Sequence, residues 1–119
     1  MILCCGEALI DMLPRETTQG MPAFAPHPGG AVFNTAVALG RLEARAGLFT
    51  GLSSDFFGDM LRDALDEAGV AHAMAVTADR PTTLAFVRLE EGQARYAFYD
   101  ENTAGRMLAR ADLPVPSDE

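Results

Sequence analysis

The chain has 119 residues, with 9 basic and 17 acidic side chains, so its formal net charge is −8. All nine basic residues are arginine, and a chain without lysine lacks the side chain that a Walker-type phosphate loop or a Schiff-base mechanism needs. The acidic balance argues against nucleic acid as a partner, and no apolar run approaches the ~20 residues that span a bilayer.

Apolar residues make up 49% of the chain, as in a folded domain or a part of one. Cys4 and Cys5 are adjacent, and neighbouring strand residues point to opposite faces, so they are poorly placed to form a disulfide. No basic segment precedes the first apolar stretch, so we expect no signal peptide and a cytoplasmic location. His27 and His72 have no ligand partners at suitable spacing, so we expect no metal site.

The first half of the chain alternates between strand and helix patterns. An apolar stretch predicts a strand over 2–13, interrupted at Gly6–Glu7 and ended by Pro14. The segment 15–30 is rich in proline and glycine, which predicts a loop or a short edge strand. An almost wholly apolar helix, expected to be buried all round, follows over 31–42, and a second buried strand over 46–52.

The second half begins with an amphipathic helix over 56–68, with N-cap candidates at Ser53–Asp55 and a glycine at position 69 to end it. A third strand is expected over 72–78. Period-two alternation then predicts a hairpin of 82–90 and 93–100, with Leu84 and Phe86 on one face of the first strand and Tyr96 and Phe98 on one face of the second. The tail, 106–119, contains a short helical stretch.

The order strand, helix, strand, helix, strand and hairpin predicts the α/β class, with a parallel sheet and an antiparallel attachment. Within it, Asp11 is an acid in an otherwise apolar strand. A carboxylate there could accept hydrogen bonds from neighbouring hydroxyls of a substrate, or it could be a structural acid bonded to backbone amides. From the residue alone, both interpretations stay open.

Two further features could carry chemistry. Gly29 and Gly30 lead into a helix whose first turn holds Asn34. Backbone N–H groups and the Asn34 amide could therefore donate to a polyol there. A glycine pair before a helix is, however, often only a turn. The spacing is not a dinucleotide-binding motif, because the next glycine is Gly40. The hairpin aromatics, among them Phe98 and Tyr99, could cover a ligand, but packing is the commoner role of such residues.

Four motifs, in chain order, are similar to those of a known family. They are Gly6–Asp11, Pro28–Asn34, Gly51–Gly58 and Pro81–Phe86. Together they resemble the ribokinase-like (PfkB) carbohydrate kinases, with the closest likeness to the fructokinase branch. The resemblance extends from Met1 to about Leu108, which is nearly the whole chain.

The resemblance implies the N-terminal part of a ribokinase-like three-layer α/β/α fold, with a small β-sheet lid formed by strands at about 12–28 and 82–100. It implies an ATP- and Mg²⁺-dependent sugar kinase that phosphorylates a primary hydroxyl, with a neutral sugar such as fructose as substrate. The substrate-binding residues it carries over are Asp11, Gly29, Gly30, Asn34, Phe98 and Tyr99.

The chain also departs from the family pattern. Many relatives have a basic residue after the paired lid aromatics, where this chain has Asp100, and an acid there disfavours anionic sugars. The family's catalytic base and nucleotide pocket would lie beyond Glu119. We therefore expect no catalytic base, no bound cofactor and no phosphoryl transfer from residues 1–119 alone.

Alternatives remain at this stage. The chain could be a non-enzymatic sugar-binding or dimerisation module, or a ribose or 2-keto-3-deoxygluconate kinase of the same family. It could also be a segment of a longer functional unit, since a sheet of three parallel strands is small for this fold class. Lid hairpins of the family often pair between subunits, so a homodimer through the lid is expected.

Overall fold

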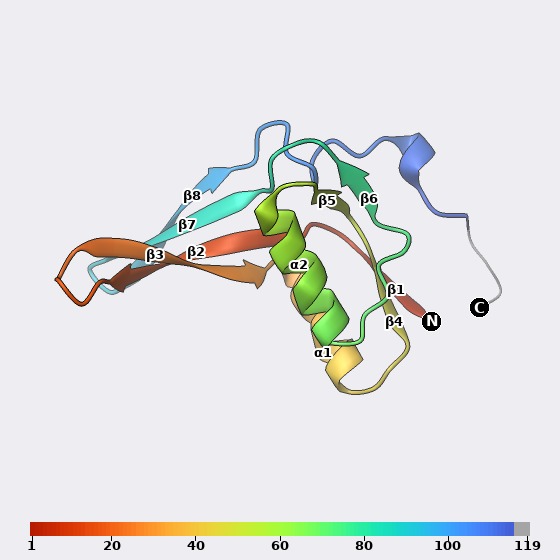
Figure 1. The fold of residues 1–119 in the computed structure, drawn as a ribbon, viewed down its shortest axis with the longest axis horizontal. Helices are drawn as coiled ribbons and strands as arrows, with labels where there is room; N and C mark the ends of the chain where they lie inside the picture. Colours follow the sequence, from red (N-terminus) through yellow and green to blue (C-terminus); the bar gives the residue numbers. More distant parts are fainter. Residues whose placement is uncertain (116–119) are drawn as a thin grey trace.

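The computed structural model describes residues 1–115, which form an elongated molecule with principal extents of 54 × 32 × 24 Å (Figure 1). Its strands are β1 (Ile2–Cys5), β2 (Leu9–Glu16), β3 (Pro22–Gly29), β4 (Ala46–Phe49), β5 (Gly51–Ser53), β6 (Val76–Ala78), β7 (Leu84–Glu90) and β8 (Gln93–Tyr99). Its helices are α1 (Ala31–Arg41), α2 (Phe56–Glu67) and the short 3₁₀ helix η1 (Arg110–Asp112). Residues 116–119 of the predicted tail lie outside the described residues.

A central sheet is built from parallel strands. β1 pairs with β4, and β6 pairs with β5. Because only Thr50 separates β4 from β5, these strands form one extended segment between β1 and β6. The neighbouring positions of consecutive strands are those expected of successive right-handed βαβ units. The predicted α/β class with a parallel sheet is confirmed.

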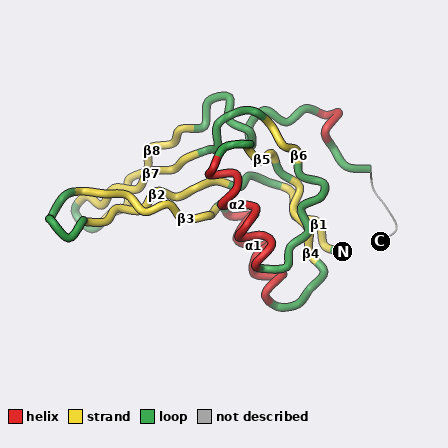
Figure 2. The backbone as a smooth tube through the Cα atoms, in the orientation of Figure 1, coloured by secondary structure: helices red, strands yellow, loops and turns green. Residues whose placement is uncertain are grey.

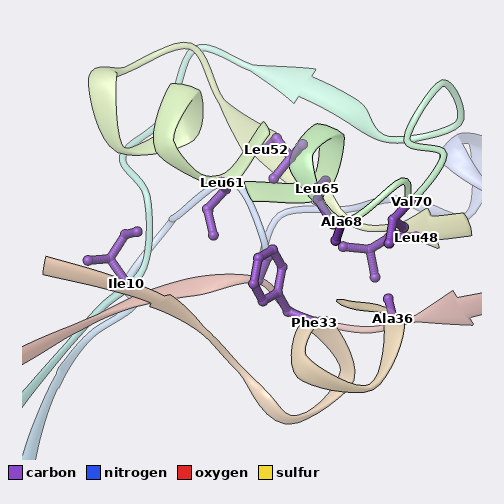
Figure 3. Packing of buried hydrophobic residues seen from close by; sticks show 10 residues of the cluster. Ile10, Phe33, Ala36, Leu48, Leu52, Leu61, Leu65, Ala68 and Val70 are labelled. Carbon is purple, nitrogen blue, oxygen red and sulfur yellow. The ribbon is translucent and has the colours of Figure 1, made fainter. Parts of the chain in front are cut away.

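Both helices pack against one face of the central sheet. Phe33 of α1, Leu48 of β4 and Leu65 of α2 belong to one hydrophobic cluster, which Figure 3 shows between the two helices. Burying side chains of this size contributes about 1.5–3 kcal/mol each. Asn34 and Ala38 of α1 are exposed, so the prediction that this helix is buried all round is wrong for the described residues. The described residues therefore supply the central sheet and one of the two helical layers expected for this fold.

A second, outer sheet extends away from the helices (Figures 1 and 2). We use this name for the four strands in the order β3-β2-β7-β8. It consists of two antiparallel hairpins, β2–β3 and β7–β8. A short parallel pairing of Ile10–Met12 with Leu84–Phe86 joins them. The outer sheet therefore unites two segments that are far apart in the sequence.

The segment 2–13 forms two strands in different sheets rather than one. The chain changes sheet after Gly6, whose N–H donates to the carbonyl oxygen of Phe49 at 3.2 Å. A Cβ atom at Gly6 would lie 2.5 Å from Cγ2 of Val32, so only glycine fits this passage. Pro14 does not end β2, because its missing N–H would point towards β7, which pairs with β2 only as far as Met12.

The segment 15–30 contains a full edge strand, β3, where the sequence predicted a loop or a short strand. The prolines of β3 occupy positions 22, 26 and 28. These even-numbered positions direct their backbone nitrogens away from β2, so proline removes no hydrogen bond between the two strands. The prolines keep this free edge from pairing further, which is a common protection of edge strands.

The other predicted elements match the structure with small differences. The helix predicted over 56–68 is α2, and Gly69 follows it with a φ of 73°. The strand predicted over 72–78 is limited to β6, because a turn in which the Ala75 N–H donates to the His72 carbonyl precedes it. The turn of the second hairpin lies at Glu91–Gly92, where both residues have positive φ, as a two-residue hairpin requires.

Asp55 connects the start of α2 to the segment before β7. Its Oδ1 accepts hydrogen bonds from the Gly58 N–H at 2.8 Å and the Thr82 hydroxyl at 2.7 Å, and its Oδ2 accepts from the Thr82 N–H at 3.0 Å. Burial opposes the charged form, but the hydrogen bonds from Thr82 and Gly58 outweigh it and hold the pKa of Asp55 below its usual value of 3.8.

We expect Asp55→Asn to destabilise the chain by about 1 kcal/mol at neutral pH, because Asn can still cap α2 but cannot accept from all three donors. The folded-state pKa lies below that of the unfolded chain, so the stabilisation is fully present above pH 3.8 and is lost as the pH falls through the folded-state value. Urea unfolding over a pH series checks this. Parallel pH profiles for the two proteins would contradict it.

Candidate functional site

Four side chains form a row across one face of the outer sheet. Asp11 on β2 pairs directly with His27 on β3 and with Ala85 on β7, and Ala85 pairs with Phe98 on β8. Directly paired residues project to the same face of a sheet. We call this the Asp11 face. It presents a carboxylate between an imidazole and an aromatic ring, a combination suited to a polyol ligand with polar and apolar edges.

The Asp11 carboxylate lies over Gly29. A Cβ atom at Gly29 would be 2.3 Å from Oδ2 of Asp11, so the carboxylate occupies space that any other residue would fill. Asp11 is half-buried, and within residues 1–115 its carboxylate accepts no hydrogen bond. Asp11 is therefore not a structural acid bonded to backbone amides of residues 1–115, and its carboxylate oxygens are open to other donors.

Gly30 leads from this point into α1. It is the N-cap of α1, with a φ of 108°, and a Cβ atom there would lie 2.8 Å from the carbonyl oxygen of Glu7. Both the backbone conformation and the close approach therefore require glycine. The Asn34 N–H donates to the Gly30 carbonyl at 2.8 Å in the first turn, and the Asn34 side chain is exposed. Successive contacts thus connect Asp11 to Gly29, and Gly30 to the backbone of Asn34.

The two aromatic residues of the candidate site point in opposite directions. Phe98 lies on the Asp11 face and is 59% exposed. Tyr99 pairs with Leu84 and lies on the other face, where its ring meets that of Phe86 edge-on at 5.4 Å. Leu84 and Phe86 share this second face, whereas Tyr96 and Phe98 share the first. The structure therefore brings Phe98, but not the Tyr99 side chain, to the row that contains Asp11.

The second face has a hollow of its own. It has a volume of about 410 Å³ and is lined largely by aromatic and charged side chains of β3, β7 and β8, among them Phe24, Phe86, Arg95 and Tyr99. Neither Asp11 nor Gly29 lines it. This hollow is therefore not the candidate site. We place the candidate site on the Asp11 face because of the polar groups gathered there.

Sequence reasoning missed His27, which it considered only as a metal ligand. The pairing of Asp11 with His27 depends on the register of β2 and β3. One signal in the sequence could have pointed to His27. The Gly29–Gly30 pair marks the turn into α1, and position 27 lies two residues before it. Without a prediction of β3 as a strand, however, no register could be assigned.

Asp100 is paired rather than free. The Arg106 guanidinium donates to its Oδ2 at 2.8 Å. The position where many family members have a basic residue is therefore occupied by an ion pair in this chain. The acid alone was expected to repel anionic sugars, but Arg106 offsets its charge, and the pair leaves neither partner fully available to a ligand.

The described residues offer no cluster of side chains suited to holding the metal ion of a bound nucleotide. Within residues 1–115, no three His, Cys, Asp or Glu side chains gather in a group that could hold a metal. The chain has no lysine to contact phosphates.

None of the described helices is long and apolar enough to cross a membrane.

Comparison with protein families gives a match to the model described as pfkB family carbohydrate kinase, over residues 1–116. Among curated relatives, the chain is 56% identical over its whole length to a fructokinase of Rhizobium leguminosarum bv. trifolii. The match covers 36% of that relative, so the chain spans about a third of the length of the curated relatives it matches.

Solved structures show the same likeness. The crystal structure of a fructokinase from Xylella fastidiosa with bound ATP matches 95% of this chain and 37% of its own, with a TM-score of 0.87 and 39% identity. A fructokinase from Vibrio cholerae O395, in a form with bound fructose, ADP and calcium ion, matches 95% of this chain and 36% of its own, with a TM-score of 0.81 and 27% identity.

Proposed function

Since the chain belongs to the pfkB family of carbohydrate kinases, we propose that it supplies the sugar-binding wall and the lid of an ATP-dependent sugar kinase. The outer sheet is the lid, and fructose is the substrate. The pair formed by Asp100 and Arg106 provides no free cation for a sugar acid, which favours a neutral sugar over 2-keto-3-deoxygluconate.

One observation carries this proposal: the half-buried Asp11 carboxylate, which accepts no hydrogen bond from residues 1–115, lies over Gly29 and in line with Phe98. A carboxylate in this position can accept from two adjacent hydroxyls of a sugar. Phe98 offers an apolar surface to the ring carbons, and the Asn34 amide can donate and accept at the start of α1. Together they would orient a sugar so that its primary hydroxyl faces away from the lid.

We assign the remaining chemistry to polypeptide outside the described residues. A kinase of this class needs a base for the sugar hydroxyl and a site for metal-bound ATP, which supplies the phosphoryl group. Residues 1–115 offer no cluster of metal ligands and no lysine for these roles. The part played by this chain is binding and orienting the sugar and excluding water above it.

A chimera tests the proposal. Residues 1–119 replace the matched segment of the Rhizobium leguminosarum fructokinase, which is 56% identical to them. We expect fructose-dependent ADP formation from the chimera and none from the 119-residue chain alone. Ribose and 2-keto-3-deoxygluconate serve as competing substrates. A folded chimera that turns over either of these faster than fructose would overturn the substrate assignment, and one that binds no sugar would overturn the function.

Gly29→Ala should weaken fructose binding with little loss of stability. The added Cβ would lie 2.3 Å from Oδ2 of Asp11, and the end of a side chain moves more easily than backbone. The carboxylate would therefore shift, and we expect affinity to fall by about 10- to 100-fold, as when one or two charged hydrogen bonds are lost. Calorimetric titration of the chimera with fructose measures the effect. An unchanged affinity would show that the position of Asp11 does not matter.

We also propose that the lid pairs with a second copy of the chain. All seven residues of β8 are exposed, and it forms an edge of the outer sheet. Tyr96, Phe98 and Tyr99 are each more than half exposed. A free edge with exposed aromatic residues is well suited to pairing. Sedimentation equilibrium tests this, and a strictly monomeric chimera would contradict it.

A cytoplasmic location remains part of the proposal. Cys4 and Cys5 are both free thiols, as is usual in a reducing compartment.

A further inference from the structure

Glu7 lies where the two sheets meet. It is in the short connection between β1 and β2, and its Oε1 accepts a hydrogen bond from the Thr83 hydroxyl at 2.6 Å. The Thr83 and Thr103 hydroxyl oxygens are also 2.6 Å apart, and each of these threonines is only 2% exposed. One carboxylate therefore connects three segments: the entry to β2, the entry to β7 and the turn that follows β8.

The chemistry of the groups gives this chain of hydrogen bonds a direction. An ionised carboxylate can only accept, so the single hydroxyl proton of Thr83 is directed to Glu7. The Thr103 hydroxyl then donates its single proton either to the Thr83 hydroxyl oxygen or to the Asp100 carbonyl oxygen, which is 3.1 Å away. Glu7 is the terminal acceptor. Without it, the Thr83 proton would turn to the Thr103 hydroxyl oxygen, and Thr103 would donate to the Asp100 carbonyl instead, so the two threonines would lose their link to the connection between β1 and β2.

The surroundings of Glu7 are tight. A Cβ atom at Gly105 would lie 3.1 Å from its Cγ and 3.2 Å from its Oε1, and a Cβ atom at Gly30 would lie 2.8 Å from its carbonyl oxygen. Glu7 is thus held between the turn into α1 and the turn after β8. Two backbone hydrogen bonds lie nearby, from the Ile10 N–H to Thr83 and from the Ala104 N–H to Pro81.

We propose that Glu7 is a positioning residue for the sugar site. By holding Thr83 it fixes the start of β7 against β2, and Asp11 lies within the short pairing that follows. It thereby sets the place of the Asp11 carboxylate relative to Gly29, Gly30 and α1. The consequence for the sugar rests on the proposed function, whereas the effect on the sheet junction does not.

A double-mutant cycle in the 119-residue chain tests the structural part. Glu7→Ala and Thr83→Val should each speed hydrogen exchange of the Ile10 and Ala104 amides by about 10- to 100-fold, the effect of losing a hydrogen bond to a charged group. The double variant should add little, because both changes remove the same interaction. Glu7→Gln should restore most of the protection, since its amide oxygen still accepts. Glu67→Ala, which changes an exposed acid of α2, is the matched control.

The sugar part is tested in the chimera by calorimetry and kinetics. Glu7→Ala and Thr83→Val should raise the fructose dissociation constant and KM about tenfold, with the KM for ATP unchanged and rescue by Glu7→Gln. Unchanged amide exchange, or additive effects in the cycle, would overturn the proposal. Faster exchange with unaltered fructose affinity would overturn the positioning role. If the parent chimera binds no fructose, the proposed function fails, while faster exchange still supports the junction held by Glu7.

Discussion

Asp11→Ala should lower kcat/KM for fructose in the chimera by about 10²- to 10⁴-fold, the largest functional effect that we expect from any single change. A hydrogen bond to a charged group contributes about 1.5–3 kcal/mol, and a carboxylate that accepts from two hydroxyls makes two of them. Each 1.4 kcal/mol corresponds to about a tenfold change in rate. The fold should remain intact, because no internal donor of the described residues depends on this carboxylate.

Steady-state kinetics with fructose and with ATP varied separately measure this effect. Asp11→Asn should give a smaller loss, since its amide oxygen can still accept from one hydroxyl. Glu16→Ala is the matched control, because Glu16 is an exposed acid on the same strand whose register position places it on the opposite face. An Asp11→Ala protein with the melting temperature and the kcat/KM of its parent would refute the role of Asp11 in sugar binding.

Gly51→Ala should destabilise the chain by about 3 kcal/mol, a large effect for one added methyl group. The new Cβ would lie 2.0 Å from the carbonyl oxygen of Ala104 and 2.7 Å from its carbonyl carbon. Backbone cannot rotate away as a side chain can, so the turn after β8 would have to move. Forcing a methyl group into a filled space typically costs about 1–3 kcal/mol. The shift would also disturb the Thr103 hydroxyl, which belongs to the chain of hydrogen bonds that ends at Glu7.

Urea denaturation gives the free energies of unfolding for this comparison. Gly69→Ala is the control, because nothing lies within 4 Å of its added Cβ and its cost is limited to the positive φ of 73°. We expect that strain to be about 1 kcal/mol. If Gly51→Ala were no more destabilising than Gly69→Ala, the close contact between β5 and the turn after β8 would not exist in solution.

Local signals were sufficient to predict the helices and the turn of the second hairpin. Asp55 was among the N-cap candidates for α2, Gly69 was expected to end it, and Glu91–Gly92 to reverse the chain. Each of these depends on the conformation of one or two residues and on hydrogen bonds to near neighbours. Interactions of this kind are contained in a short stretch of sequence.

Pairing between distant segments could not be predicted in the same way. The parallel contact of Ile10–Met12 with Leu84–Phe86 joins strands more than seventy residues apart, and it places Asp11 beside Ala85. The alternation along β8 did separate Phe98 from Tyr99, but only the pairing with β7 and β2 decides which of them shares a face with Asp11. The candidate residues were therefore identifiable one by one, while their arrangement required the register of four strands.

The way the outer sheet is assembled also affects how such a chain can change over evolutionary time. Each of its hairpins closes on itself, and within the described residues the strands of the two hairpins pair along three residue pairs that include Asp11. Residues can be inserted or deleted at the far tips, Thr17–Met21 and Glu91–Gly92, without changing that seam. Length variation among homologues should therefore concentrate at the two tips, while the seam keeps a constant length.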